Sequence, residues 1–441
     1  MDIAMPPLLH IVSLGCTKNL VDSEVMLARL KEFAITDNPS AADVIIVNTC
    51  GFIDAAKEES INTILSLHGR RKNGSLLVMA GCLSERYKAE LQAEFTEVDL
   101  FTGVGDYAKI EELISNKKSG FSDHVFLQQD EDRVITNSGY HAYIKIAEGC
   151  NQSCSFCAIP TFKGKLQSRS IQSITTEIKR LITRGYFDFT LIAQDSSSFG
   201  RDHGEKDELI KLIMEIDMID GVKRARLCYL YPSTTSRKLI DTIAFSKRFA
   251  PYFDMPIQHA SDRMLKVMRR GVGIKKTLDL IDYMRAVPNS YVRTAFIVGH
   301  PQEKEEDFNA MRDLIDSGIF DRASLFAFSD EKGSVANKMK RKVDSRTINI
   351  RLQKGKSILK RMHKKRLENQ IGNVFNAVIE KKDNSGFFIE AKVLNFAPEI
   401  DPKILINESE KTLRTGDIVS VKIVDASDDL LIARALKDNN G

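Results

Sequence analysis

Short apolar runs and stretches of helical periodicity alternate over the N-terminal quarter of the chain. Three continuous apolar runs are typical of buried strands: 8–15, 43–49 and 75–81. An amphipathic stretch follows each of them, at 20–33, 52–67 and 84–95. A weaker repeat of the pattern occupies 100–103 and 106–114. Strands that alternate with helices form parallel sheets, so we predict a parallel-sheet α/β domain over residues 7–116.

The alternation resumes beyond a polar stretch, 117–136, which we interpret as a linker or small hairpin. Helical stretches such as 175–185 and 306–318 separate six further strand-like runs: 141–148, 189–195, 224–231, 252–258, 291–299 and 325–329. Six units are too few for a closed eightfold barrel, so residues 137–367 are predicted to form an open, partial (β/α)6 TIM barrel. A long basic helix is expected over 341–370, packed back on this barrel.

The last seventy or so residues change character. Apolar and polar positions alternate with a period of two in five short runs: 373–382, 386–394, 403–407, 417–426 and 429–436. Turn residues separate the runs. This pattern predicts a small all-β barrel of the OB type over residues 370–438.

Composition places the chain among globular proteins that work in a reducing compartment. It has 441 residues, of which 43% are hydrophobic and 28% charged, and no apolar run reaches the roughly 18 residues of a membrane span. The N-terminus lacks the charged and apolar regions of a secretory signal. Seven cysteines, an odd number, argue against a disulfide framework. We expect a cytoplasmic protein without membrane association.

The net charge of +4 is unevenly distributed. Residues 338–366 contain thirteen Lys or Arg against one acidic residue, whereas residues 371–441 contain nine basic and twelve acidic residues. The basic stretch could contact nucleic acid or a ribosome surface, or it could be a solvated helix face.

Three cysteines stand within eight residues just after the first strand of the predicted barrel: Cys150, Cys154 and Cys157. Iron–sulfur clusters are usually held by four thiolates, so three ligands would leave one iron open. A structural zinc site needs a fourth Cys or His nearby, and none follows in the sequence. The alternative, three ordinary buried thiols, suits a single cysteine better than three at this spacing.

Another cysteine follows each of the first three predicted strands: Cys16, Cys50 and Cys82. Ligands of parallel sheets collect at the carboxyl ends of the strands, where helix N-termini also favour anions. Three cysteines that are distant in sequence can therefore converge there. We predict a second cluster held by three cysteines, the alternative being three unrelated buried thiols.

The spacing Cys-x3-Cys-x2-Cys, with Phe156 before the last cysteine, resembles the radical S-adenosylmethionine (SAM) superfamily. That resemblance implies that the open iron binds SAM and that Phe156 packs near its adenine. The N-terminal motifs resemble the methylthiotransferases within this superfamily: 15–24 (GCTKNLVDSE), 48–53 (NTCGFI) and 80–83 (AGCL). The C-terminal run GDIVSVKIVDA resembles their TRAM domain. By this resemblance the N-terminal cysteines hold an auxiliary [4Fe-4S] cluster.

Two stretches resemble the branch that modifies a ribosomal protein (RimO type): GCTKNLVDSE and LIAQDSSSFG. The resemblance implies two [4Fe-4S] clusters and SAM as cofactors, and a methylthio group inserted at the β-carbon of an aspartate of small-subunit ribosomal protein twelve. A 5′-deoxyadenosyl radical would take the hydrogen, the auxiliary cluster would carry the sulfur, and a second SAM would supply the methyl group. No acid or base is assigned to a side chain.

Polar residues at the strand ends are candidates for the SAM pocket. Gln194 and Asp195 close the second barrel strand, and Gln258 and His259 close the fourth. The fifth strand resembles the superfamily's glycine-rich strand near adenine, where Gly299 would allow a close approach. The chain departs from that pattern with His300 and Gln302, where relatives commonly have an aromatic residue and a glycine. For each candidate a purely structural hydrogen bond is the alternative, and Cys228 is expected in the core.

Two other functions stay open at this point. The tRNA-modifying branch (MiaB type) would act on adenosine, but the acidic C-terminal barrel favours a protein substrate over RNA. A non-catalytic iron–sulfur protein that binds RNA or the ribosome would load clusters without cleaving SAM. The expected partners are the ribosomal protein or the assembled small subunit, and an electron donor that the sequence does not identify. We expect a monomer.

Overall fold

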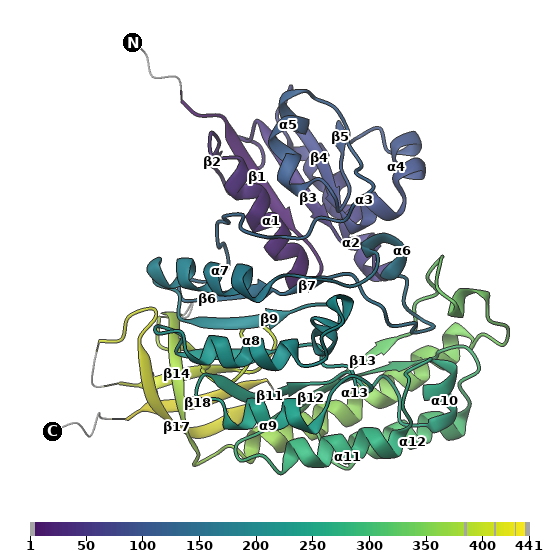
Figure 1. Ribbon diagram of the computed structural model, residues 1–441, viewed down its shortest axis with the longest axis vertical. Helices are drawn as coiled ribbons and strands as arrows, with labels where there is room; N and C mark the ends of the chain where they lie inside the picture. Colours follow the sequence, from purple (N-terminus) through teal and green to yellow (C-terminus); the bar gives the residue numbers. More distant parts are fainter. Residues whose placement is uncertain (1–4, 383–385, 410–411, 428, 437–441) are drawn as a thin grey trace.

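The computed structural model describes residues 5–382, 386–409, 412–427 and 429–436. It has three parts, and the predicted fold class is confirmed (Figure 1). A parallel-sheet domain lies on one side of a six-stranded, open barrel. The last part of the chain forms a separate five-stranded β-barrel. Among the described residues, no helix is both long and apolar enough to cross a membrane.

The N-terminal domain is built on a five-stranded parallel sheet. Its strand order is β2-β1-β3-β4-β5, so the three longest strands are direct neighbours: β1 (Leu8–Ser13), β3 (Val44–Thr49) and β4 (Leu76–Gly81). The short strands β2 (Ala34–Ile35) and β5 (Leu100–Phe101) form its edges. The helices are α1 (Thr17–Arg29), α2 (Asp54–Arg70), α3 (Cys82–Arg86), α4 (Lys88–Glu94) and α5 (Ile110–Ser115). β3 is buried along its whole length, as its uninterrupted apolar run predicts.

The central part is an open barrel of six parallel strands in the order β13-β12-β11-β10-β9-β6. These strands are β6 (His141–Lys145), β9 (Asp188–Ile192), β10 (Arg224–Leu227), β11 (Phe249–Asp254), β12 (Tyr291–Val298) and β13 (Arg322–Ala327). Covering helices include α7 (Ile171–Thr183), α8 (Glu208–Asp217), α9 (Arg237–Phe245), α11 (Ile274–Arg285) and α12 (Glu305–Asp316). Serines cap three of the helices, as when Ser170 accepts a hydrogen bond from the backbone N–H of Ser173.

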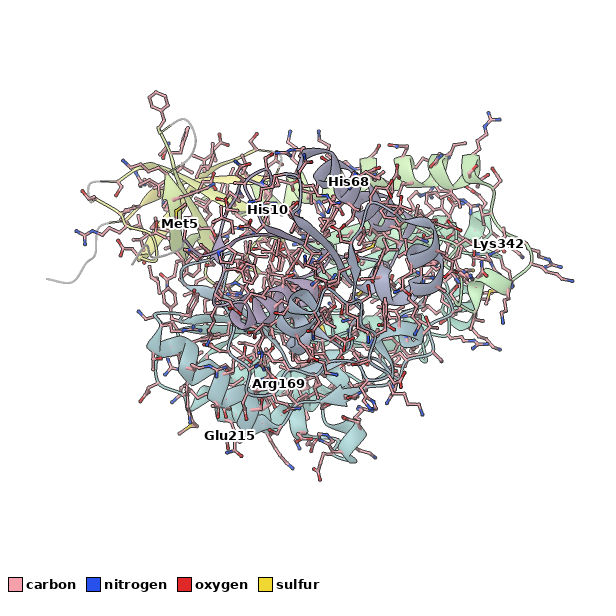
Figure 2. All side chains as sticks on the ribbon, turned by 90° about the horizontal axis from the view of Figure 1, so that it is seen from above. Met5, His10, His68, Arg169, Glu215 and Lys342 are labelled. Atoms are coloured by element: carbon pink, nitrogen blue, oxygen red, sulfur yellow. The ribbon has the colours of Figure 1, made fainter. Side chains whose placement is uncertain are left out.

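The long basic helix is α13 (Ser345–Glu368), and it packs against β13 and α12. It begins where Asp344 accepts a hydrogen bond from the Thr347 N–H at 2.9 Å. The segment before the barrel, 117–136, contains no helix or strand, but it is well anchored: Arg133 is buried and pairs with Glu24 of α1 and Glu177 of α7. Arg169 is likewise fully buried, whereas Lys342 is exposed and lies toward the edge of the view in Figure 2.

The C-terminal part is a closed barrel in the order β14-β15-β16-β18-β17. Its strands are β14 (Val374–Lys382), β15 (Ile389–Val393), β16 (Lys403–Glu408), β17 (Ile418–Ser427) and β18 (Leu430–Ala435). The connection between β15 and β16 packs into the lumen of the central barrel, where Ala397 joins a buried cluster with Tyr143 and Tyr252. From the other side, Val21 of α1 enters the same cluster. All three parts therefore meet inside the open barrel.

Candidate iron–sulfur and SAM site

The three N-terminal cysteines lie at adjacent strand ends, as predicted. Cys16 follows β1 and caps α1, Cys50 comes directly after β3, and Cys82 is the first residue of α3 after β4. Because β1, β3 and β4 are neighbours in the sheet, their carboxyl ends form one continuous edge. We call Cys16, Cys50 and Cys82 the N-terminal trio.

The side chain of Asn19 ties the three cysteine loops together. Its amide donates to the carbonyl oxygens of Leu14 and Thr49, each at 3.1 Å, and its Oδ1 lies 3.5 Å from Cys82 Sγ. Asn19 is buried, and its three partners would lose these hydrogen bonds if its side chain were removed. One residue in the first turns of α1 thus fixes the spacing of all three loops.

Glycines beside the trio allow the loops to approach closely. Gly15 has a φ of +84°, and a Cβ there would lie 2.5 Å from the Cβ of Cys50. Gly81 has a φ of +94°, and a Cβ there would lie 2.2 Å from Oδ1 of Asn48. Any side chain at either position would push the loops apart, so both glycines are required by the convergence of the trio.

The second set of cysteines lies on the loop between β7 (Ala147–Glu148), a short strand outside the barrel sheet that follows β6, and α6 (Pro160–Lys163). We call Cys150, Cys154 and Cys157 the barrel trio. Cys154 Sγ lies 3.4 Å from the hydroxyl of Tyr231 and accepts a hydrogen bond from Arg270 Nη1 at 3.1 Å. The guanidinium of Arg270 also stacks 4.1 Å from the centre of the Tyr231 ring.

The donor chemistry of both trios fits an iron–sulfur cluster. Burial raises the pKa of Cys50 to about 11 and the pKa of Cys150 and Cys157 to about 12. Such thiols ionise when a metal cation binds them. In the described part of the chain, no three His, Cys, Asp or Glu side chains are placed to hold a single metal ion. A four-iron cluster differs from a single ion because each of its thiolates binds a separate iron.

The two trios belong to neighbouring parts of one interface. Cys82 shares a buried cluster with Ala158 and Phe162, which follow Cys157 on the barrel loop, and α3 packs against α6. At the opposite edge of the six-stranded sheet, Arg86 and Lys57 of the N-terminal domain both pair with Glu331, beyond the carboxyl end of β13. The carboxyl edge of the N-terminal sheet therefore lies against the carboxyl end of the barrel (Figure 1).

Four fully buried charges hold the domains together beside this interface. Asp22 and Glu148 both pair with Lys145 and with Lys163, and the Lys163–Glu148 distance is 3.2 Å. Burial alone would raise the pKa of Glu148, but the attraction of Lys163 and Lys145 outweighs burial and lowers its pKa to about 2. Removing one member would leave an unpaired buried charge, a change that costs about 3–5 kcal/mol in other proteins.

The predicted SAM residues lie at the strand ends, and several of them have structural partners. Gln194 donates to Glu148. Asp195 accepts from Gln152 at 2.7 Å and from the hydroxyls of Ser197 and Ser198. The Asp195–Gln152 bond ties the end of β9 to the barrel trio's loop, and the Oε1 atom of Gln194 is buried without a partner among the described atoms.

The other SAM candidates are Phe156, Gln258, His259 and Gly299. Phe156 is half-buried beside the cysteines, and Gln258 adopts a left-handed φ of 75°. His259 is fully buried and accepts backbone N–H bonds at Nδ1. A Cβ at Gly299 would lie 2.4 Å from Ile348 of α13, so in this structure the glycine makes room for that helix. Contact of any of them with SAM stays a prediction.

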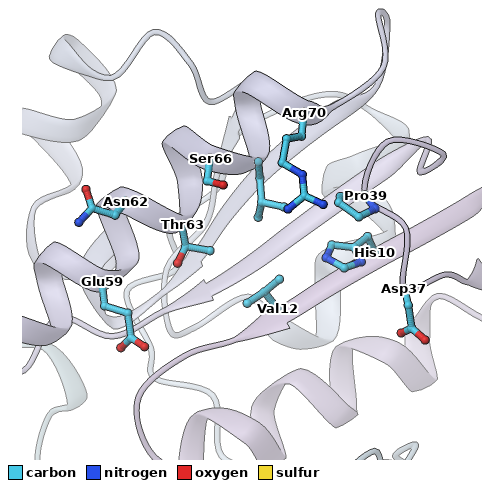
Figure 3. A pocket seen from close by; sticks show the side chains of 10 residues that line it. His10, Val12, Asp37, Pro39, Glu59, Asn62, Thr63, Ser66 and Arg70 are labelled. Atoms are coloured by element: carbon cyan, nitrogen blue, oxygen red, sulfur yellow. The ribbon is translucent and has the colours of Figure 1, made fainter.

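A surface groove of about 590 Å³ lies elsewhere on the N-terminal domain, between β1 and α2 (Figure 3). His10, Glu59 and Arg70 are among its lining residues, and none of the cysteines reaches it. The volume of this groove does not by itself indicate a ligand or a reaction, so we assign the candidate site from the cysteine loops.

Three stretches of the chain match models of known protein families. Residues 8–103 match the family described as "Uncharacterized protein family UPF0004", residues 144–315 the "Radical SAM superfamily", and residues 371–436 the "TRAM domain". A protein from a Nitratiruptor species, named "Ribosomal protein uS12 methylthiotransferase RimO", is 55% identical over 96% of this chain and 98% of its own length. A protein of the same name from Aliarcobacter butzleri is 52% identical over 97% and 98%.

The chain belongs to the RimO family of radical SAM methylthiotransferases. Among solved structures, the radical SAM methyltransferase TsrM from Kitasatospora setae, with cobalamin and a [4Fe-4S] cluster bound, aligns with a TM-score of 0.55. That alignment has 15% sequence identity and covers 75% of this chain and 77% of TsrM. The likeness supports the fold of this RimO-family chain and nothing beyond it.

Two residues that contact Cys154 are absent from the sequence-based prediction. Tyr231 ends the apolar run 224–231, so its place at a strand end could have drawn attention to it. Arg270 lies in the connection between α10 (Asp262–Val267) and α11, and no local pattern indicates that it reaches Cys154. Cys228 is buried in the lumen cluster, as expected of a core residue.

Proposed function

We propose that this chain inserts a methylthio group at the β-carbon of an aspartate of ribosomal protein uS12. The observation that carries the proposal is the juxtaposition of two cysteine trios, each at the carboxyl edge of a parallel sheet, across one domain interface. The name shared by the two curated relatives, at more than half identity over nearly the whole chain, supports the choice of substrate.

Under this proposal the barrel trio holds one [4Fe-4S] cluster that also binds SAM, and the N-terminal trio holds a second. Together they supply radical and sulfur chemistry at an unactivated C–H bond, which side-chain acids and bases cannot deprotonate. Six cysteines serve the two clusters: Cys16, Cys50, Cys82, Cys150, Cys154 and Cys157. The strand-end residues Phe156, Gln194, Asp195, Gln258, His259 and Gly299 are proposed to line the SAM pocket.

The chain's own side chains hold the two cysteine loops in place and shield them from water. Arg270 donates to Cys154 and stabilises negative charge on that sulfur, while Tyr231 holds the guanidinium in place by stacking. Gln152 and Asp195 fix the barrel trio's loop against the end of β9. Asn19 fixes the N-terminal trio in the same way. The apolar packing of Cys82 with Ala158 and Phe162 excludes water from the interface.

A second candidate function is methylthiolation of tRNA adenosine. The acidic balance of residues 371–441, nine basic against twelve acidic, disfavours a phosphate-binding surface on the C-terminal barrel. A monomer working in the cytoplasm with an external electron donor completes the proposal.

A side-by-side assay distinguishes the two substrates. Equal amounts of uS12 and unmodified tRNA are incubated anaerobically with the reconstituted chain, SAM and reductant, and both are analysed by mass spectrometry. We expect a methylthiolated aspartate in uS12 and unmodified tRNA. Preferential modification of tRNA would reject the proposed substrate, and cluster loading without any 5′-deoxyadenosine would indicate a non-catalytic protein.

A further inference from the structure

Lys18 is a buried cation at the junction of the two trios. It is the second residue of α1, two positions beyond Cys16, and only 8% of its surface is exposed. Its Nζ lies 3.8 Å from the ring centroid of Tyr229, which follows β10 in the middle of the six-stranded sheet. The side chain thus crosses from the N-terminal domain to the mouth of the barrel.

In the described part of the chain the ammonium group forms no ion pair with a carboxylate, although Glu148 and Cys16 are close enough to attract it. Buried lysines normally pair with an acid, and the neighbouring Lys145 and Lys163 both do so. A ring face compensates a desolvated ammonium only in part. The ammonium group of Lys18 is therefore available to form an ion pair with a bound anion.

One acid near Lys18 and one that contacts the backbone of Tyr229 are already engaged. Glu148 accepts from Lys145, Lys163 and Gln194. Asp254 accepts from Arg293 at 3.1 Å and from the backbone N–H of Tyr229. None of them can move to Lys18 without leaving another buried donor unpaired.

We propose that Lys18, held by the ring of Tyr229, binds the side-chain carboxylate of the substrate aspartate. This inference rests on the proposed function. The carboxylate carbon is bonded to the β-carbon, so a cation that holds the carboxylate fixes the reacting C–H bond between the two trios. The first turn of α1 adds its positive dipole end at the same place. Lys18 is a substrate-positioning and specificity-determining residue in this account.

The test also distinguishes a second role, because Cys16 lies two residues away: Lys18 would then balance the charge of the N-terminal trio's thiolates. The two roles predict different losses. A carboxylate-binding lysine affects the choice between aspartate and asparagine in the substrate, whereas a thiolate-balancing lysine affects iron content.

The test is a double-mutant cycle with Lys18→Met and a uS12 variant that carries asparagine at the target aspartate. The binding constants of both uS12 forms are measured for wild type, Lys18→Met and Lys18→Arg, with Lys31→Met as the control for loss of one charge. Lys31 lies exposed just beyond the end of α1. Iron content and the yield of 5′-deoxyadenosine without uS12 are recorded for each variant.

We expect wild type to bind the aspartate form about 30-fold or more tightly than the asparagine form, since loss of a buried charge partner has effects of that order. Lys18→Met should bind the two forms within about threefold of each other, with unchanged iron. Lys18→Arg should retain part of the preference, and Lys31→Met all of it.

An undiminished preference in Lys18→Met would overturn the inference, and so would a loss of about half its iron. If Lys18→Met does not fold, Tyr229 gives the same test: Tyr229→Phe should retain the preference and Tyr229→Leu should lose much of it. The inference would also be overturned if Tyr229→Phe and Tyr229→Leu showed the same preference for the aspartate form of uS12 over the asparagine form. A wild type that leaves uS12 unmodified would instead reject the proposed function.

Discussion

Joint replacement of Cys150, Cys154 and Cys157 by alanine is expected to lower reconstituted iron from about eight to about four atoms per chain and to abolish SAM cleavage. The reason is that these thiols are the only cysteines on the barrel loop, and the N-terminal trio lies on a different sheet. Iron and sulfide analysis, together with chromatography of 5′-deoxyadenosine, provides the measurement.

Cys228→Ala is the matched control for this experiment. Cys228 is a buried cysteine of the same barrel, 1% exposed, and it packs among Ile192, Ala250 and Tyr252. It should keep the full iron content and the full rate of SAM cleavage. If the triple variant still bound about eight irons, the assignment of one cluster to each trio would be wrong.

The second large effect is expected from joint replacement of Cys16, Cys50 and Cys82. This variant should retain about four irons and cleave SAM, yet yield no methylthiolated uS12, since the proposed source of sulfur is lost. The Cys50 thiol lies beside Gly15, so alanine fits there where a larger residue would not. The folded state is verified by the thermal unfolding midpoint before activity is compared.

Both products are followed in the same reaction mixture for that variant. Persistent methylthiolation would remove the N-terminal trio from the sulfur-insertion step. Loss of SAM cleavage together with a normal unfolding midpoint would show that the two trios do not act separately. Cys228→Ala serves again as the control, with both products expected.

Strand ends were predictable from the sequence because continuous apolar runs stop where the cysteines stand. Cys50 and Cys82 directly follow buried strands, and the strand order of the sheet then brings the N-terminal trio to one edge. The barrel trio was predictable for a simpler reason, since its three residues are close in sequence. The C-terminal barrel followed from its period-two alternation.

Contacts between distant segments could not be predicted in this way. Arg270 reaches Cys154 across 116 positions, and Lys18 reaches Tyr229 only because α1 docks on the barrel. Gly299 lies against Ile348 of α13, a contact that its sequence context does not indicate, and its approach to SAM stays a prediction. Each of these depends on how whole elements pack, which hydrophobic periodicity does not encode.

The filling of the barrel lumen is a further property that local patterns do not contain. Residues from α1 and from the connection after β15 enter the same buried cluster, as shown by Val21 and Ala397. Both flanking parts therefore contribute side chains to the interior of the barrel. The two trios are proposed to act on a single carbon atom across the interface that Cys82 shares with Ala158 and Phe162.

The most direct test of that central claim uses uS12 with deuterium at the β-carbon of the target aspartate. The chain, reconstituted with iron and sulfide, is incubated anaerobically with SAM and reductant. The account predicts deuterium in 5′-deoxyadenosine in proportion to the methylthiolated product formed at the same carbon. Methylthiolated uS12 accompanied by 5′-deoxyadenosine free of deuterium would contradict it.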